Sequence, residues 1–305
     1  MKESYHICFT SHGEVMFRDS EDHGMFINLM ALRAFDTGTE LLADAEMSTH
    51  VHLNLLADDP MAFAKRLRIS YTKYFNHKYG REGRFGEKYT YLLKVDGFNH
   101  QLVLLNYILR NGLHHAASPT ALGYLYCSVR DMYQEDIGLS RDQPVQLSRE
   151  DIAHFLPRHS EFPDKYQMNE NGVFIRSSFM ELRRVEQHYG SPRNFLFQMN
   201  RLTDPSWSDE QQRDETGKPL TLADVEQADE RSISQMLNNE YGRNFSRNRL
   251  QDMDVCRLID RQLAPRFGAS SAYGLTENQK QRLARQLLYE YRLPDAQIRR
   301  CLVLP

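Results

Sequence analysis

Apolar and polar positions change their period several times along the first hundred residues, which predicts alternating strands and helices. Strands are predicted at residues 5–10, where apolar and polar residues alternate, and at residues 40–45, 47–56 and 89–95. Helical spacing of apolar residues predicts helices at residues 25–35, 60–79 and 98–109. The helix at 60–79 also has an acidic cap and an early proline in Asp58-Asp59-Pro60. This order predicts an α+β fold in which antiparallel strands carry helices.

The remainder of the chain follows a different pattern. Residues 136–148 are polar and include Gly138 and Pro144, which is typical of a linker. We therefore predict a first domain at 1–135, a linker at 136–148 and a helical domain at 149–305. Near its end, residues 276–303 read as a helix, a break and a basic helix. This is the order of a helix-turn-helix that contacts DNA, although any helical bundle contains such corners.

Composition fits a folded protein of the cytoplasm. The 305 residues are 41% hydrophobic, and the four cysteines are far apart, which favours reduced thiols over a zinc site or disulfides. No apolar run approaches the ~20 residues that a membrane span needs. The first residues also lack a charged leader followed by a long apolar stretch. We therefore expect a cytoplasmic protein with no membrane partner.

Basic residues concentrate in one segment, although the net charge of −3 by itself gives no sign of nucleic-acid binding. Residues 65–94 contain nine Lys or Arg against two acidic residues, with seven Phe or Tyr among them. Cations beside aromatic rings suit single-stranded nucleic acid, whose phosphates meet the cations and whose bases stack. An amphipathic helix with a solvated basic face has the same composition, so both interpretations stay open. The candidate DNA-binding residues are Lys65, Arg66, Arg68, Lys73, Lys78, Arg81, Arg84, Lys88 and, further along, Arg110.

Two histidines lie one residue apart in the strand predicted at 47–56. Because side chains alternate between the faces of a strand, His50 and His52 share one face, roughly 7 Å apart. From there two imidazoles can converge on one divalent metal ion, with Val51 turned into the core behind them. Two histidines on a solvated strand face would show the same spacing.

Tyr107 and Asn111 form a second pair. They are four residues apart in a helical segment and share a face, about 6 Å apart, and Gly112 is expected to end the helix. If this helix crosses the sheet near the histidines, two imidazoles and an amide oxygen can hold a divalent cation. Such a set leaves open positions, which favours Mg²⁺ or Mn²⁺ over a closed structural zinc. A phenol beside that cation can attack a phosphodiester. By itself, Tyr107 also fits a packed aromatic residue.

In this order, the motifs resemble the single-tyrosine HUH transposases, especially the REP-associated tyrosine transposases, over roughly residues 1–135. The matching pieces are His50-Val51-His52, the basic aromatic segments 74–80 and 83–89, Tyr107-Ile108-Leu109-Arg110-Asn111, and Tyr126-Cys127-Ser128. One departure is Gly112, which stands where the family usually has proline. The helical C-terminal part lies outside the core family domain.

The resemblance implies a ferredoxin-like HUH domain in which His50, His52 and Asn111 bind Mg²⁺ or Mn²⁺ and Tyr107 is the nucleophile. It implies cleavage and strand transfer of single-stranded or hairpin DNA through a 5′-phosphotyrosine intermediate, as in DNA transposition and recombination, with no nucleotide cofactor. It also implies a bacterial, nucleoid-associated protein. Members of the family occur as dimers and as monomers, so a homodimer stays open.

Two other functions remain open from the sequence. A domesticated protein could bind DNA hairpins as a regulator after losing cleavage. In a metal-dependent phosphodiesterase, water would attack the phosphate and Tyr107 would only pack.

Overall fold

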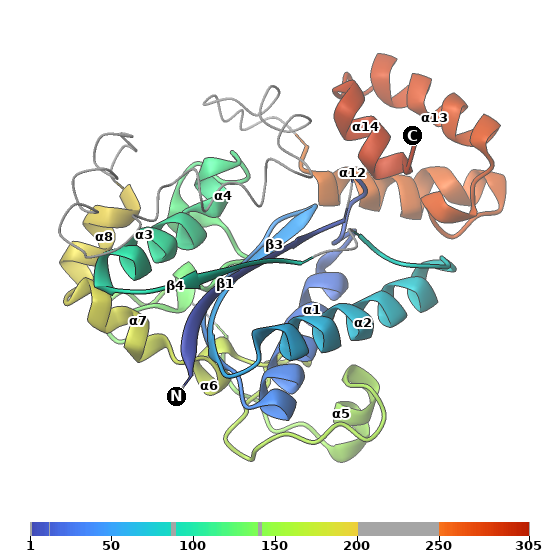
Figure 1. Cartoon of the computed structure of the whole chain (residues 1–305). Coiled ribbons are helices and arrows are strands. Elements are labelled where there is room, and N and C mark those ends of the chain that lie inside the picture. Colours follow the sequence, from blue (N-terminus) through green and yellow to red (C-terminus); the bar gives the residue numbers. More distant parts are fainter. Residues whose placement is uncertain (1, 12, 87–89, 140–141, 201–249, 305) are drawn as a thin grey trace.

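Four strands form one antiparallel sheet at the centre of the protein (Figure 1). The computed structural model describes residues 2–11, 13–86, 90–139, 142–200 and 250–304. The strands are β1 (Glu3–Thr10), β2 (Glu40–Glu46), β3 (His50–Ala57) and β4 (Tyr91–Val95). Their spatial order is β2-β3-β1-β4, and helices follow β1 and β3 in the chain. This is a ferredoxin-like arrangement, so the predicted α+β fold is confirmed.

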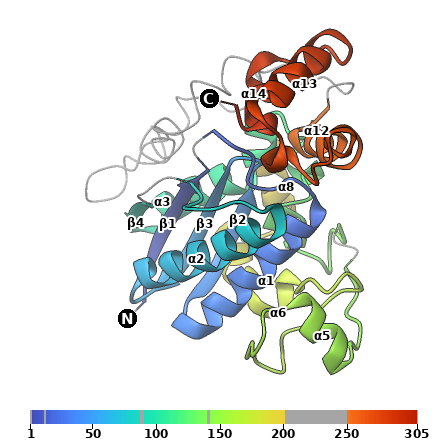
Figure 2. The same cartoon turned by 90° about the vertical axis from the view of Figure 1, so that its right-hand side faces the viewer.

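Helices cover both faces of the sheet. Helices α1 (Ser20–Thr37) and α2 (Pro60–Tyr79) lie on one face, and α3 (Phe98–Leu109) lies on the other (Figures 1 and 2). The strand register assigns the side chains, because Cys8 is opposite His52 and Phe9 is opposite Val51. Phe9 packs against Phe26 of α1 at 5.9 Å between ring centroids. Successive side chains alternate faces, so His52 points toward α3.

Local signals set the ends of α2 where the sequence predicts them. Asp59 Oδ1 accepts a hydrogen bond from the backbone N–H of Ala62 at 2.9 Å, and Pro60 occupies the first turn. Gly80 ends the helix with a left-handed φ of 63°. Because apolar residues recur at helical spacing between these caps, the helix buries one stripe in the core.

The chain beyond β4 is largely helical. The described helices are α4 (Asn111–His114), α5 (Arg149–Phe155), α6 (Arg176–Phe179), α7 (Leu182–Tyr189), α8 (Pro192–Asn200), α12 (Asp252–Leu258), α13 (Glu277–Tyr289) and α14 (Asp295–Leu302). Short 3₁₀ turns lie at Ala121–Gly123, Ser128–Asp131, Ala264–Phe267 and Ala272–Gly274, and a π turn lies at Ile259–Leu263. None of these helices is long and apolar enough to span a membrane.

Two clusters of buried apolar residues divide the described chain. The larger cluster joins the sheet and its helices to residues 149–200, for example through Val185 and Phe195. The smaller cluster is built from residues 255–302, and Val15 is its contribution from the N-terminal part. The predicted domain boundaries stay a prediction, but the packing groups residues 149–200 with the sheet.

The C-terminal helices α12, α13 and α14 are docked at one end of the sheet (Figures 1 and 2). Arg18, which is fully buried, donates to Asp260 at 2.7 and 2.8 Å and to the carbonyl oxygen of Cys301 at 3.0 Å. Ser48 Oγ donates to Asp252 Oδ2 at 2.8 Å. Helices α13 and α14 lie where the sequence predicts a helix-turn-helix, and their contact with DNA stays a prediction.

Candidate active site

The structure brings the predicted nucleophile and the two predicted metal-binding histidines together on the α3 face of the sheet. The His52 and Tyr107 rings lie 5.1 Å apart between centroids, and the His50 and His52 rings 5.0 Å apart. All three side chains are at most 6% exposed. These histidines therefore do not lie on a solvated strand face.

A third histidine, His6 of β1, completes this cluster, and the sequence pattern did not point to it. His6 Nε2 lies 3.0 Å from His52 Nδ1, and the two rings are stacked at 5.2 Å. A His52 ring that donates from Nδ1 to His6 keeps its lone pair on Nε2, the tautomer that a metal ligand needs. Thr49 Oγ1 lies 3.3 Å from Nδ1 of His50 and can favour the same tautomer there. Finding His6 required the pairing of β1 with β3, which the sequence alone does not specify.

Asn111 does not share a helix with Tyr107, contrary to the prediction. Helix α3 ends at Leu109, and Asn111 begins the short helix α4 after Arg110. The prediction that Gly112 ends the helix is wrong, because Gly112 is buried inside α4. A Cβ atom on Gly112 would lie 2.4 Å from Cβ of Tyr124, so only glycine fits this close approach.

The Asn111 amide is suited to bind a ligand. It is fully buried, and neither Oδ1 nor Nδ2 has a hydrogen-bond partner in the described part of the chain. A buried polar group without a partner costs about 1–3 kcal/mol. Asn111 is flanked in sequence by Tyr107, which packs on His52, and by His115, whose ring lies 4.9 Å from that of His50. A divalent cation held by both histidines is the partner that the sequence predicts for this amide oxygen.

Among the described residues, Asp, Glu and Cys side chains do not complete a metal site with these histidines. Across the described residues, no group of three or more His, Cys, Asp or Glu side chains is arranged to hold a metal ion. A metal ion bound at His50 and His52 would therefore need a further ligand of another type, and the Asn111 amide oxygen is the predicted candidate. The donor set fits a cation that accepts oxygen and imidazole and keeps open positions.

Further polar side chains continue the layer between the sheet and α3. Ser4 Oγ donates to Gln101 Oε1 at 2.6 Å, and Asn54 Nδ2 donates to Ser4 Oγ at 3.1 Å. Gln101 Nε2 donates in turn to Asn54 Oδ1. This network holds α3 on the strands with directional contacts and so fixes the height of Tyr107 above the sheet.

The predicted DNA-binding cations fall into separate groups. Lys65, Arg66 and Lys73 are exposed on α2, on the opposite face of the sheet from Tyr107. Arg84 is exposed after α2. The structure therefore does not bring the α2 cations to the predicted nucleophile.

The other predicted cations have internal partners or lie elsewhere. Lys78 pairs with Asp19 and Asp22 at 2.7 and 2.9 Å, Arg81 pairs with Glu14 at 2.7 Å, and Arg68 donates to Thr90 Oγ1 at 2.8 Å. Arg110 is half-buried at the junction of α3 and α4, and its charge opposes the rise that burial causes in the pKa of Tyr189. Lys88 lies outside the described residues.

A buried charge network lies on the face of β2 that is turned toward α1. The Arg176 guanidinium donates to both carboxylate oxygens of Asp44 at 2.9 and 2.8 Å and to Glu46 Oε1 at 3.3 Å. The other Glu46 oxygen lies 2.7 Å from Nδ1 of His23. Burial raises the pKa of Glu46 well above its usual range, although Arg176 opposes this, and burial lowers the pKa of His23. No pattern in the sequence indicated that residue 176 reaches β2.

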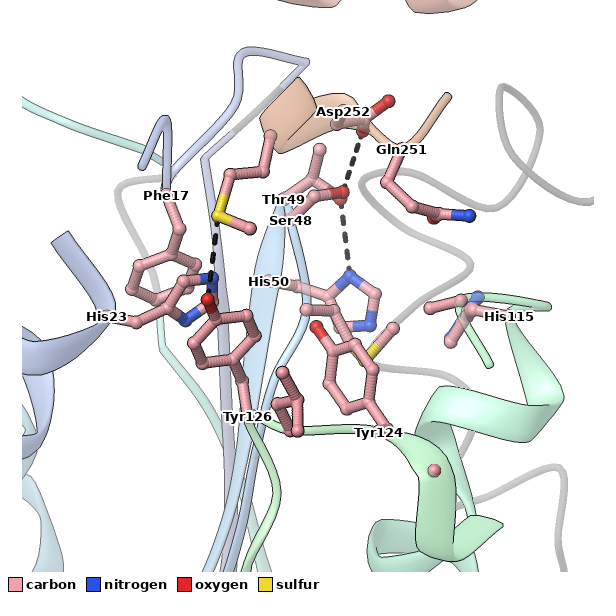
Figure 3. Close-up of a pocket in the computed structure, with 15 residues that line it drawn as sticks. Phe17, His23, Ser48, Thr49, His50, His115, Tyr124, Tyr126, Gln251 and Asp252 are labelled. Carbon is pink, nitrogen blue, oxygen red and sulfur yellow. Dashed lines mark hydrogen bonds between the residues drawn. The ribbon is translucent and has the colours of Figure 1, made fainter. Parts of the chain in front are cut away.

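A cavity of about 230 Å³ lies beside this network and is also lined by His50 (Figure 3). On one side the His23 ring is stacked between Phe17 at 4.1 Å and Tyr126 at 3.4 Å. Tyr124 donates its hydroxyl to the Glu46 carbonyl oxygen at 2.7 Å. The cavity therefore reaches from the candidate metal ligand His50 to the sheet edge at β2.

Comparisons with known proteins give a limited likeness. Neither the models of known protein families nor the sequences of curated proteins give a match. One similar solved structure is a REP-associated tyrosine transposase bound to a REP hairpin, with 12% identity and a TM-score of 0.38 over 48% of this chain and 89% of that one. Another is a candidate transposase from Deinococcus radiodurans, with 19% identity and a TM-score of 0.28 over 34% of this chain and 86% of that one. Because both TM-scores lie below 0.5, we base the function on this chain's own side chains.

Proposed function

We propose that this protein cleaves and transfers single-stranded DNA through Tyr107, with a divalent cation held by His50, His52 and Asn111. The observation that carries this proposal is the convergence of Tyr107 and the two histidines, together with the buried amide of Asn111, four residues after Tyr107, which lacks a hydrogen-bond partner in the described part of the chain. Mg²⁺ or Mn²⁺ are the cations that this donor set favours. When bound, the cation would polarise the phosphodiester and offset the charge of the transition state.

The side chains of the protein would position and activate the reacting groups. Tyr107 Oη attacks phosphorus and forms a phosphotyrosyl bond, while the bond between phosphorus and the 3′ oxygen breaks and that oxygen takes up a proton. The phenol, with an ordinary pKa of about 10, must lose its proton as it attacks. Its neighbours are basic rings, because His6 and His114 lie 6.5 and 6.0 Å from the Tyr107 ring. His114 is exposed and can pass a proton on to water.

A second candidate function is hairpin binding without cleavage, as in a regulator that has lost the reaction. The depth of the site favours this alternative, since Tyr107 is only 6% exposed and Asn111 is fully buried. Cleavage would require α3 and α4 to admit a phosphate between themselves and the strands.

Trapping of a covalent adduct separates the two candidates. The full chain is incubated with Mn²⁺ and a labelled single-stranded DNA library that carries a fixed hairpin and randomised flanks. We expect a detergent-resistant adduct whose modified peptide contains Tyr107, and we expect loss of the adduct in Tyr107→Phe or with EDTA. Tyr91→Phe is the matched control, because Tyr91 lies on the same face with its ring 5.7 Å from that of His6. An adduct that forms as well in Tyr107→Phe would refute the nucleophile, and hairpin binding without any adduct would favour the regulator.

A further inference from the structure

The cavity beside His50 has one wall that the sheet does not supply. The turn between β2 and β3 and the segment 123–126 form part of it, and Gln251, Asp252 and Met253 at the start of α12 form the opposite wall (Figure 3). In the sequence, Gln251 follows the turn between β2 and β3 by about 200 residues and the segment 123–126 by about 125. The pocket therefore exists only when the C-terminal helices are docked.

Buried polar contacts hold the α12 wall in place. Asp252 accepts from Ser48 Oγ at 2.8 Å and from the Arg300 guanidinium at 2.6 and 2.9 Å. Gln297 Nε2 adds a further donor to Asp252 at 3.0 Å. Arg18 and Asp260 provide a second anchor. These contacts thus define the position of Gln251 and Met253 opposite His50.

The lining of the cavity suits a flat, uncharged ring with polar edges. Tyr124 and Tyr126 supply aromatic surface, and Met47 and Met253 supply thioethers that pack well on rings. Gln251, which is half-buried, and Thr49, which is buried, contribute an amide and a hydroxyl to the lining. Such apolar walls with a few polar groups are typical of small-ligand pockets.

Charge argues against a phosphate as the occupant. The described residues that line the cavity include no Lys and no Arg, and Asp252 contributes a carboxylate whose pKa is lowered by Arg300 despite burial. An anion in the cavity would therefore meet neither Lys nor Arg among the described lining residues, and the Asp252 carboxylate is already paired with Arg300. A nucleobase carries no charge, and its hydrogen-bonding edge can face the polar margin.

We propose that this pocket receives one unstacked nucleobase of the DNA strand, next to the phosphate that Tyr107 attacks. This inference rests on the proposed function, and His50 connects the two because it lines the pocket and packs on His52. Only an unpaired base can leave its stack at low cost, so the pocket adds a preference for single-stranded DNA. The C-terminal helices would then be part of the substrate site.

Binding of short oligonucleotides tests the pocket apart from the cleavage reaction. The affinities of thymidine and adenosine octamers are compared with that of a fully abasic octamer by fluorescence anisotropy, in the Tyr107→Phe background. We expect at least one base-containing octamer to bind about 5- to 150-fold more tightly than the abasic one, as one stacked base would provide. Gln251→Ala and Leu125→Ala, at the margin of the pocket, should reduce this ratio. Gln262→Ala is the matched control, since Gln262 is exposed and does not line the cavity.

Photo-crosslinking locates the base. A thymidine octamer with single 5-iodouracil substitutions should crosslink to peptides that contain Tyr124, Tyr126 or Met253. Equal affinity for base-containing and abasic octamers, or crosslinks only to other surfaces, would overturn the inference. If the protein forms the Tyr107 adduct but shows no preference for base-containing octamers, the proposed function stands and the pocket proposal fails. If the preference for base-containing octamers depends on Gln251 but no adduct forms, the pocket proposal stands and the result argues against cleavage.

Discussion

Removing the Arg176 guanidinium should destabilise the fold far more than removing a surface arginine from the same part of the chain. Arg176 is 8% exposed and makes three hydrogen bonds to Asp44 and Glu46, both of which are fully buried. Arg176→Met would keep most of the aliphatic volume and leave both carboxylates without their main counter-charge. Breaking a buried ion pair by removing one partner costs about 3–5 kcal/mol. We expect the free energy of unfolding at pH 7 to fall by that amount.

The loss of unfolding free energy in Arg176→Met should become smaller as the pH is lowered. Arg176 opposes the rise that burial causes in the pKa of Glu46, so in Arg176→Met this pKa should rise further. Between neutral pH and the ordinary carboxyl pKa of about 4.3, the folded variant then binds a proton that the unfolded chain does not. Stability of the variant relative to wild type therefore recovers as the pH falls through the folded pKa of Glu46.

Urea unfolding followed by circular dichroism at 222 nm measures both effects. Arg184→Met is the matched control, because Arg184 pairs with Glu40 at 3.0 Å but is 53% exposed. An exposed pair of this kind contributes about 0–1 kcal/mol. A loss in Arg176→Met no larger than in Arg184→Met, or a loss that grows on acidification, would show that the buried network is not organised by Arg176.

Three further changes probe other parts of the protein. His6→Ala should weaken Mn²⁺ binding about 10- to 100-fold in a spectroscopic titration, because it removes the partner that orients His52. An unchanged Mn²⁺ affinity would exclude a role of His6 in orienting His52. Gly112→Ala should lower the free energy of unfolding by about 1–3 kcal/mol, since its Cβ would overlap the Tyr124 side chain, and an unaltered urea midpoint would contradict this close approach. Arg18→Met should release the C-terminal helices from the sheet, which would be measured as faster tryptic cleavage within residues 250–304. Resistance to trypsin equal to that of wild type would mean that other contacts are sufficient to hold these helices on the sheet.

The sequence predicts the elements of the first part of the chain well, because each is encoded locally. Local strand patterns indicate β1 to β4, and caps such as Asp59 and Gly80 indicate the limits of α2. The spacing of His50 and His52 fixes their common face through the geometry of a single strand. Each of these inferences uses residues within one element, where the physical rule has a known period.

What depends on contacts between distant segments was not predictable in the same way. His6 joins the histidine cluster only because β1 pairs with β3, and Arg176 reaches Asp44 across 132 residues. The α12 wall of the cavity lies still further along the chain. The basic stretch on α2 illustrates the converse, because its composition suggested contact with the substrate while the fold places α2 across the sheet from Tyr107. Composition identifies what a segment can bind, and topology decides where.

The two faces of the central strands give the strongest reason to treat the histidine cluster as functional. On the side of α1 and α2, β1 and β3 contribute apolar residues such as Ile7 and Leu53, which form a dense core. On the α3 side, alternate residues of the same strands are polar, including His6, His52 and Asn54, and all are fully buried. Stability alone would favour apolar residues on both faces, because buried polar groups gain little net free energy even when hydrogen-bonded. The α3 face therefore retains its polar side chains at a cost to stability, and a ligand that binds them is the simplest physical reason for that cost.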